Sequence, residues 1–427
     1  MGIFSVLRNN WKKTVFFSAI AGGGIWWGDK KYRESLLRAV YCKEAQKYGA
    51  VSCNLGNPRR VIVFLNPAAQ SGKARSIYEK NVAPLLHLAG LQVSLIRTEY
   101  EGQGKQYAKV IEADEVDAIV IAGGNGTVGE IVTGLFRSSK SNIPVGVIPL
   151  GKTNTVANKI FGDSGEVLNC LEAAMSIIKG VTKKENIMKI RAEEGEPVFA
   201  LSDLLWGTFR DTHAQVDKYW YYGPLKRKVA YLATTLRGTW PPTIQADITY
   251  TLPCSGCNKC VPKFEPPKWR WWHILLKPQY ELPAVDYSKI VNENCGIEHN
   301  ESISGIELHA KLNESSIAVS ILNDAPEKME FIKEGWAREK NQNLNLIKRK
   351  SIDVQSLKLN PQMPKETETK AWLNIDNEEF ELFPLTFELI KSKLLLFSSK
   401  SDIDHTQVKS PLQLLKDKCL AYAPKIN

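Results

Sequence analysis

The segment from residue 118 to residue 132 constrains the fold of this 427-residue chain more than any other. It reads Ala-Ile-Val-Ile-Ala-Gly-Gly-Asn-Gly-Thr-Val-Gly-Glu-Ile-Val, so an apolar run typical of a buried strand ends at a glycine-rich turn, and helical periodicity follows at once. This order places free backbone N–H groups and a helix N-terminus together, which suits binding of an anion such as phosphate. Glycine fits because a Cβ would hold phosphate away from the backbone. A plain tight turn is the alternative.

The same alternation of strand and helix continues on both sides of this segment. Between residues 61 and 190, apolar runs at 61–65, 92–97, 118–122 and 145–148 are separated by segments with helical periodicity. This pattern predicts a doubly wound parallel sheet that binds ligands at the carboxyl ends of its strands.

After residue 190 the pattern changes to short alternating segments, which predict an antiparallel β-rich domain. The clearest strands are expected at 246–252, 316–322 and 379–390. We therefore divide the chain into an N-terminal anchor or targeting segment with a helix (1–57), an α/β domain (58–190), a β-rich domain with an insertion at 253–300 (191–400) and a C-terminal tail (401–427).

Composition agrees with a two-domain globular protein that meets an acidic partner. Hydrophobic residues make up 43% of the chain and charged residues 24%, and 56 Lys and Arg against 46 Asp and Glu give a net charge of +10. A positive charge favours nucleotides, anionic lipids or nucleic acid. The sequence has no basic recognition helix, RNP motif or zinc-finger spacing, so we exclude nucleic acid.

The N-terminus predicts an uncleaved membrane anchor or a mitochondrial targeting segment. Residues 14–28 carry no charge, and Arg8, Lys12 and Lys13 precede them. This window is shorter than the about 20 residues that a spanning helix needs. Its tryptophans and glycines make a poor secretory signal core, and no small-x-small cleavage site follows. A buried helix is the alternative interpretation.

Three of the eight cysteines are regularly spaced, at Cys254, Cys257 and Cys260. Such thiols bind zinc or pair as a disulfide, but no second Cys/His pair follows at ligand spacing. Because prolines flank the segment, we interpret it as part of a variable surface loop.

Three loops of the α/β domain, at 64–74, 123–127 and 148–157, each follow a strand and precede a helix. Because parallel strands end at one edge of a sheet, we expect the loops to meet there and to bind phosphate. Lys73 offers a point charge, although the first loop lacks the spacing of a Walker loop. The candidate nucleotide-binding residues are Asn66, Pro67, Gly72, Lys73, Thr98, Gly123, Gly124, Asn125, Gly126, Thr127, Glu130, Gly151, Thr153 and Asn154.

In type and order, these motifs resemble the catalytic domain of the diacylglycerol and sphingosine lipid kinase superfamily. Segments 8–13, 73–75, 98–102, 206–211 and 218–226 are more similar still to the mitochondrial acylglycerol kinases. The resemblance implies a nucleotide-binding domain and a β-rich domain with lipid entering between them. It also implies MgATP-dependent phosphorylation of monoacylglycerol and diacylglycerol to lysophosphatidic and phosphatidic acid.

The resemblance further implies roles for acidic residues of the second domain. Asp211 and Asp376 would hold the metal, and Glu378 or Asp376 would accept the proton of the lipid hydroxyl. An ordinary hairpin turn is the alternative for Asp376-Asn377. In location, the resemblance implies the mitochondrial inner membrane, facing the intermembrane space, with its carrier translocase as a partner. The segment 268–277, which mixes tryptophan with basic residues, would contact lipid.

Three residues depart from the superfamily pattern. Asn125 replaces an aspartate, Lys152 replaces a threonine and Asn377 replaces a glycine. The lost carboxylate predicts weak Mg²⁺ binding and a rise in activity of at least about tenfold in Asn125→Asp. It also makes a kinase-fold scaffold subunit of the carrier translocase an alternative function. A third reading, a relative of the NAD kinases, leaves the apolar N-terminus unexplained.

Overall fold

The computed structural model describes most of the chain. The predicted lipid-contacting segment 268–277 and the predicted tail 401–427 lie outside the described residues. Those residues are 11–55, 58–112, 114–138, 140, 142–162, 164–236, 240–261, 287–322, 326–339, 344–362 and 371–398.

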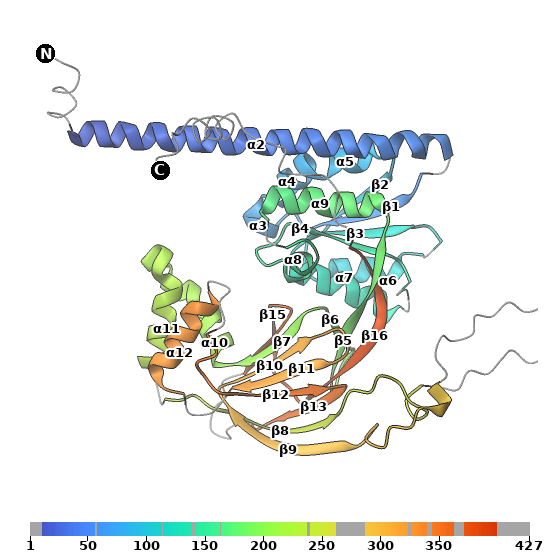
Figure 1. Ribbon diagram of the computed structural model, residues 1–427, viewed down its shortest axis with the longest axis vertical. Helices are drawn as coiled ribbons and strands as arrows, with labels where there is room; N and C mark the ends of the chain where they lie inside the picture. Colours follow the sequence, from blue (N-terminus) through green and yellow to red (C-terminus); the bar gives the residue numbers. More distant parts are fainter. Residues whose placement is uncertain are drawn as a thin grey trace, which may run out of the picture.

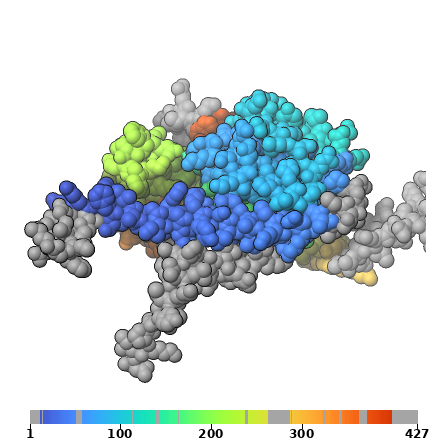
Figure 2. Space-filling view, turned by 90° about the horizontal axis from the view of Figure 1, so that it is seen from above, coloured from blue at the N-terminus to red at the C-terminus, as the bar shows by residue number. Residues whose placement is uncertain are grey.

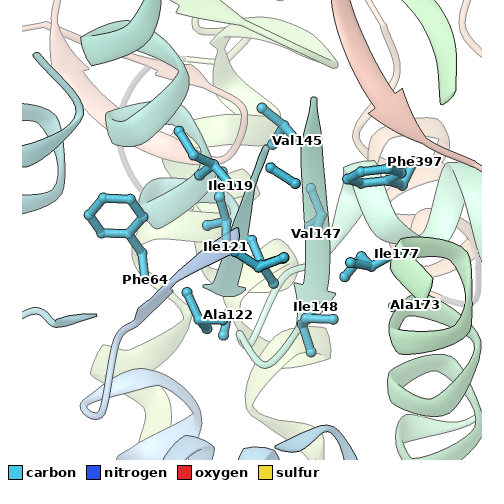
Figure 3. Packing of buried hydrophobic residues seen from close by; sticks show 14 of the residues in the cluster. Phe64, Ile119, Ile121, Ala122, Val145, Val147, Ile148, Ala173, Ile177 and Phe397 are labelled. Carbon is cyan, nitrogen blue, oxygen red and sulfur yellow. The ribbon is translucent and has the colours of Figure 1, made fainter. Parts of the chain in front are cut away.

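The α/β domain contains the four parallel strands that the sequence predicts. They are β1 (Arg60–Leu65), β2 (Gln92–Arg97), β3 (Ala118–Gly123) and β4 (Val145–Pro149), in the spatial order β2-β1-β3-β4. Every residue of β3 and β4 is buried, because helices cover both faces of this part of the sheet. Figure 3 shows the resulting core, in which Ile121, Val147 and Ile177 lie between the strands and a covering helix.

Helices cover both faces of the parallel sheet. In Figure 1, α4, α5 and α9 lie on one side, and α6 and α7 lie on the other. The helices are α3 (Ala69–Gly72), α4 (Ala74–Asn81), α5 (Ala83–Leu88), α6 (Gln103–Val110), α7 (Asn125–Arg137), α8 (Thr155–Phe161) and α9 (Glu166–Lys179).

The second domain is built from antiparallel strands in two sheets that enclose a separate core. Its strands are β5 (Thr182–Ala192), β6 (Val198–Ala200), β7 (Asp203–Gly207), β8 (Ile244–Thr251), β9 (Glu298–Gly305), β10 (Glu307–Leu312), β11 (Ile317–Leu322), β12 (Arg349–Val354), β13 (Ser356–Pro361), β14 (Trp372–Ile375), β15 (Glu378–Glu381) and β16 (Leu385–Phe397). Its helices are α10 (Thr208–Ala214), η1 (Val216–Leu225), α11 (Lys226–Leu236), η3 (Tyr287–Lys289) and α12 (Lys328–Arg338).

The two domains share one continuous sheet through β16. This strand pairs with β13 and β5 in the second domain, and Leu396 pairs in parallel with Val145 of β4. Residue 190, at which the sequence suggests a boundary, lies inside β5. The strand predicted at 379–390 is instead the end of the hairpin strand β15 and the start of β16, because Pro384 interrupts it.

The N-terminal helix α2 (Trp11–Leu55) has two unlike halves. Its later part packs on α5 and α9, and Tyr41 and Ala45 are fully buried there. Its earlier part extends past the α/β domain (Figures 1 and 2) and exposes Phe17 and Trp26 by more than 60%. Within the part of the chain that the structure describes, no helix is both long and apolar enough to span a membrane.

Candidate functional site

The second and third glycine loops pack directly against each other at the carboxyl edge of the sheet. A Cβ on Gly124 would lie 3.1 Å from the Gly151 Cα and 3.3 Å from the Thr153 carbonyl oxygen. The Asn125 N–H donates to that same oxygen at 3.1 Å. Glycine is therefore needed at 124 and 151 for the two loops to approach each other, in addition to any need of a ligand.

The first loop joins this edge through Asn66. Its Nδ2 donates to the Thr127 Oγ1 at 3.1 Å, and its backbone N–H donates to the Ala122 carbonyl at 3.1 Å. Thr98, at the end of β2, is buried and donates its N–H to Leu65 at 3.0 Å. The structure thus brings the predicted residues of β1, β2 and β3 to one edge.

Pro67 begins the rest of the first loop, which is held in an unusual backbone conformation. Gln70, Ser71 and Gly72 have φ values of 53°, 57° and 82°, which is the left-handed region that only glycine adopts without strain. Lys73 follows as the N-cap of α4. Two consecutive non-glycine residues with positive φ are a common sign of a functional loop.

Asn125, the residue that departs from the superfamily pattern, is buried with 3% exposure. Its Oδ1 accepts the Thr155 N–H at 2.9 Å, and its Nδ2 donates to the Thr155 Oγ1. The side chain therefore binds the first residue of α8, and both of its polar atoms are engaged. This geometry favours a structural role for Asn125, which the sequence predicts to be a nucleotide-binding residue in place of the superfamily aspartate.

Asp376, a predicted metal-binding and catalytic residue, is held by backbone N–H groups of the second domain. Its carboxylate accepts from Leu201 and Ser202, each at 2.7 Å, and from Asp203 at 3.1 Å. Burial raises its pKa to about 6, against the effect of these hydrogen bonds. Asp376 and Asn377 have φ values of 48° and 70°, so they form the turn between β14 and β15. Because asparagine tolerates this conformation, the loss of the superfamily glycine costs little.

Glu378 crosses from the second domain to the glycine turn. A Cβ on Gly126 would lie 2.5 Å from its Oε1, and the Gly126 N–H donates a hydrogen bond to its carboxylate. Burial raises the pKa of Glu378, and the carboxylates of Glu101 and Glu130 raise it further. The side chain is thus a carboxylate at the N-terminus of α7 that takes up a proton more readily than an ordinary glutamate.

Glu130 lies one turn further along α7 and caps another helix. Its Oε1 accepts the Gly102 N–H at 2.7 Å, next to the start of α6. Burial raises its pKa, as it does for Glu378. The contact favours a structural role in fixing the loop that carries Glu101.

Asp211 belongs to a second group of acidic residues, organised by buried Arg210. The Arg210 guanidinium contacts the Asp211 Oδ1 at 2.9 Å and the Glu379 Oε1 at 2.8 Å, and its Nε donates to the Asn374 Oδ1 at 2.9 Å. Burial raises the pKa of Asp211, and Arg210 opposes this effect. Glu379, which the sequence did not single out, therefore accompanies Asp211.

A polar cavity of about 510 Å³ lies between the third loop and the second domain. The predicted residues Gly151, Thr153 and Asn154 line it from one side, and Asp203 and Asn377 line it from the other. Sequence reasoning missed Asp203, which binds His309 at 2.9 Å, because no motif surrounds it.

Two residues that line this cavity each carry an acceptor without a hydrogen-bond partner. The Oδ1 of Asn169 and the Oε1 of Gln70 are buried without a hydrogen-bond partner. Their amide nitrogens bind Gly162 at 2.9 Å and Glu166 at 3.0 Å, which fixes the direction of each acceptor. A buried acceptor costs about 1–3 kcal/mol when unpaired, so a hydrogen-bond donor that reached either oxygen would be bound favourably.

Comparisons with known proteins agree with this arrangement. Residues 60–190 match the model of the diacylglycerol kinase catalytic domain, and residues 201–410 match that of the acylglycerol kinase C-terminal region. The chain is 35% identical over 411 residues to human mitochondrial acylglycerol kinase, covering 92% of this chain and 96% of the relative. It is 44% identical over 259 residues to the Xenopus laevis protein of the same name, covering 59% of each.

Among solved structures, a putative diacylglycerol kinase from Bacillus anthracis has the same fold. The TM-score is 0.51 at 16% identity, and the match covers 80% of this chain and 97% of that one. At this identity the likeness supports the two-domain architecture and nothing further.

Proposed function

Because the chain belongs to the acylglycerol kinase family and is therefore a lipid kinase, we propose that it transfers the γ-phosphoryl group of ATP to monoacylglycerol and diacylglycerol. The products are lysophosphatidic acid and phosphatidic acid. The position of Glu378 against the N-terminus of α7 is the observation that carries this proposal.

Glu378 is the general base in this proposal. The lipid hydroxyl oxygen forms a bond to the γ-phosphorus, the bond from that phosphorus to the β-γ bridging oxygen breaks, and ADP leaves. Glu378 accepts the hydroxyl proton, for which its raised pKa is suited. Asp376 is less suited, because backbone N–H groups occupy its carboxylate.

The residues present fit ATP with a divalent metal. Asn66, Thr127 and the glycine turn supply neutral donors and a helix N-terminus for phosphates. The unpaired acceptors of Asn169 and Gln70 suit the ribose hydroxyls or the amino group of the base. Asp211 and Glu379 would hold Mg²⁺, which neutralises charge on the transferred phosphoryl group.

Two exposed apolar surfaces support contact with a membrane. One is the early part of α2, and the other is η1, where Trp220 and Tyr221 are 74% and 62% exposed. Both lie at the same end of the molecule in Figures 1 and 2. Lys226 and Arg227 follow η1, so this end combines aromatic and basic residues, as membrane-surface segments do.

We propose a mitochondrial location because the relatives are named mitochondrial, and we propose the inner membrane, facing the intermembrane space, on resemblance alone. The carrier translocase stays a proposed partner on resemblance alone. Deleting residues 1–31 removes the exposed part of α2 and spares Tyr41 and Ala45, so the fold should survive. We expect the shortened protein to leave the membrane pellet on alkaline extraction; retention there would move the anchor elsewhere.

The activity is tested with purified protein, radiolabelled ATP and a panel of acceptors. We expect Mg²⁺-dependent labelling of monoacylglycerol and diacylglycerol, with little labelling of sphingosine or NAD. Labelling of NAD alone would replace the proposal with a nucleotide kinase. If no acceptor is labelled although ATP binds, the scaffold function becomes the better account.

A further inference from the structure

We propose that Cys254, Cys257, Cys260 and Cys295 bind a structural zinc ion as four thiolates. Their sulfur atoms all lie within 4.8 Å of one another. The sequence showed the first three and no second pair, and the fold supplies the fourth ligand from 35 residues further along. The site is independent of the kinase chemistry described above.

The spacing of the sulfur atoms fits a tetrahedral ion. Zn–S bonds of about 2.3 Å place the sulfurs of a tetrahedron about 3.8 Å apart. The Cys257 and Cys260 Sγ atoms are 3.7 Å apart. A disulfide needs about 2.05 Å, and all four thiols are free in the structure.

Hydrogen bonds to sulfur repeat along the loop and suit thiolates. The Lys259 N–H donates to the Cys257 Sγ at 3.4 Å, and the Gly256 N–H donates to the Cys254 sulfur. In both cases the donor lies two residues after the cysteine. The Asn292 Nδ2 also donates to the Cys254 Sγ, at 3.3 Å. Donors around metal-bound sulfur orient the ligand and stabilise its charge.

Backbone conformation and nearby charge support the same site. Gly256 has a φ of 124°, which lets the chain turn sharply between Cys254 and Cys257. Four thiolates with one Zn²⁺ carry a net charge of about −2. Lys391, whose Nζ donates to the Cys254 carbonyl at 2.6 Å, and Lys259, whose Nζ donates to the Glu293 carbonyl at 3.3 Å, lie close enough to offset it.

The ion would join the two ends of the predicted insertion. Cys254 follows β8 and Cys295 precedes β9, and these strands pair at Thr251 and Glu298. Zinc would therefore close the long connection between them at its base. Because metal binding replaces four thiol protons, which pass to solvent, the bound form should be less stable at low pH.

Elemental analysis of the full chain, purified under reducing conditions without chelator, tests the proposal. We expect about one zinc per chain in the parent. In Cys257→Ser and in Cys295→Ser, the zinc content should fall by about two-thirds or more. Cys42→Ser, which changes a thiol in α2 remote from the cluster, should keep it. If Cys257→Ser does not fold, Cys260→Ser replaces it, because Cys260 is exposed.

Cobalt substitution gives a second readout. Cobalt held by four thiolates shows thiolate charge-transfer and visible d–d bands, and we expect both in the parent and in Cys42→Ser only. Stoichiometric iron in place of zinc would overturn the choice of ion. Purified protein that contains no metal would overturn the site. This holds whether alkylation shows that the four thiols are free or mass spectrometry shows that they form disulfides.

Discussion

The two sides of the candidate site differ in the groups they present. The α/β domain contributes backbone N–H groups, amides and hydroxyls, as at Asn66, Thr127 and the Gly124–Gly151 contact. The β-rich domain contributes carboxylates, including Glu378, Glu379 and Asp211. Phosphate oxygens are bound by the first kind of group, and metal ions and protons by the second. We therefore expect the α/β domain to bind the nucleotide and the β-rich domain to supply the acid–base and metal chemistry.

Among the substitutions that test this difference between the domains, Glu378→Gln should have the largest effect on activity. An amide keeps the shape and the contact with Gly126 but cannot accept a proton, so we expect kcat to fall by about 10²- to 10⁴-fold with nucleotide affinity nearly unchanged. Glu388→Gln, a half-exposed carboxylate of the same domain paired with Lys189, is the matched control. If Glu378→Gln lowered only the affinity for nucleotide, Glu378 would belong with the phosphate-binding groups of the α/β domain rather than act as a base.

Gly151→Ala tests the phosphate-binding groups of the α/β domain. The new Cβ would contact Gly124 Cα, and the Thr153 oxygen would lie 3.0 Å away, so the two loops must separate. We expect ATP affinity to fall by at least about tenfold, with a loss of about 1–3 kcal/mol in unfolding free energy. The measurements are calorimetric titration and denaturant unfolding.

The control for this change is Gly129→Ala in α7, where a Cβ would meet no atom within 4 Å. It should stabilise the helix by up to about 1 kcal/mol and leave ATP binding unchanged. Equal ATP affinity in Gly151→Ala and the parent would show that the loop contact is not part of the nucleotide site.

Asn125→Asp separates the sequence-based prediction from the structural one. The sequence predicts a rise in activity of at least about tenfold. The structure places both polar atoms on Thr155, whose hydroxyl is able to reverse and donate to a carboxylate. We therefore expect less than about a threefold change in kcat/KM and no change in the Mg²⁺ requirement. A tenfold rise would restore the metal role of this position.

Glu101→Gln should give the smallest effect, on pH dependence alone. The Glu101 carboxylate helps to raise the pKa of Glu378, and a base works only when deprotonated. Removing this charge should move the acidic limb of the kcat profile to lower pH by less than about one unit. Glu99→Gln, two residues away, should leave the limb in place, and an identical shift in both variants would point to a general surface-charge effect.

The α/β domain was predictable because its signals are local. A buried parallel strand is a continuous apolar run, and β3 and β4 begin at the predicted residues and end one residue later. The glycine turn at 123–127 and the other two loops could also be predicted from the sequence, since each joins a strand to a helix. Their mutual packing through Gly124 and Gly151 was not, because nothing in either loop indicates how close the other lies.

The β-rich side could not be resolved in the same way. β7 pairs with β10 and β14, which come from distant parts of the chain, and no local pattern specifies such pairing. The sequence predicts a metal or proton-accepting role for Asp376, but no local pattern indicates that the N–H groups of residues 201–203 bind its carboxylate. Cys295 lies near the end of the insertion and its three companions lie near the start, so the complete cluster could be recognised only from the fold.

The path of β16 also determines when the protein is able to finish folding. Leu394, Leu396 and Phe397 belong to the core of the α/β domain, although the rest of that core is synthesised mostly before residue 200. During translation, the nucleotide-binding half must therefore wait for almost the whole chain before its hydrophobic core is complete. A chain that stops at residue 390 would lose part of its first domain as well as its last strand, and the early domain would be exposed to chaperones and proteases throughout synthesis.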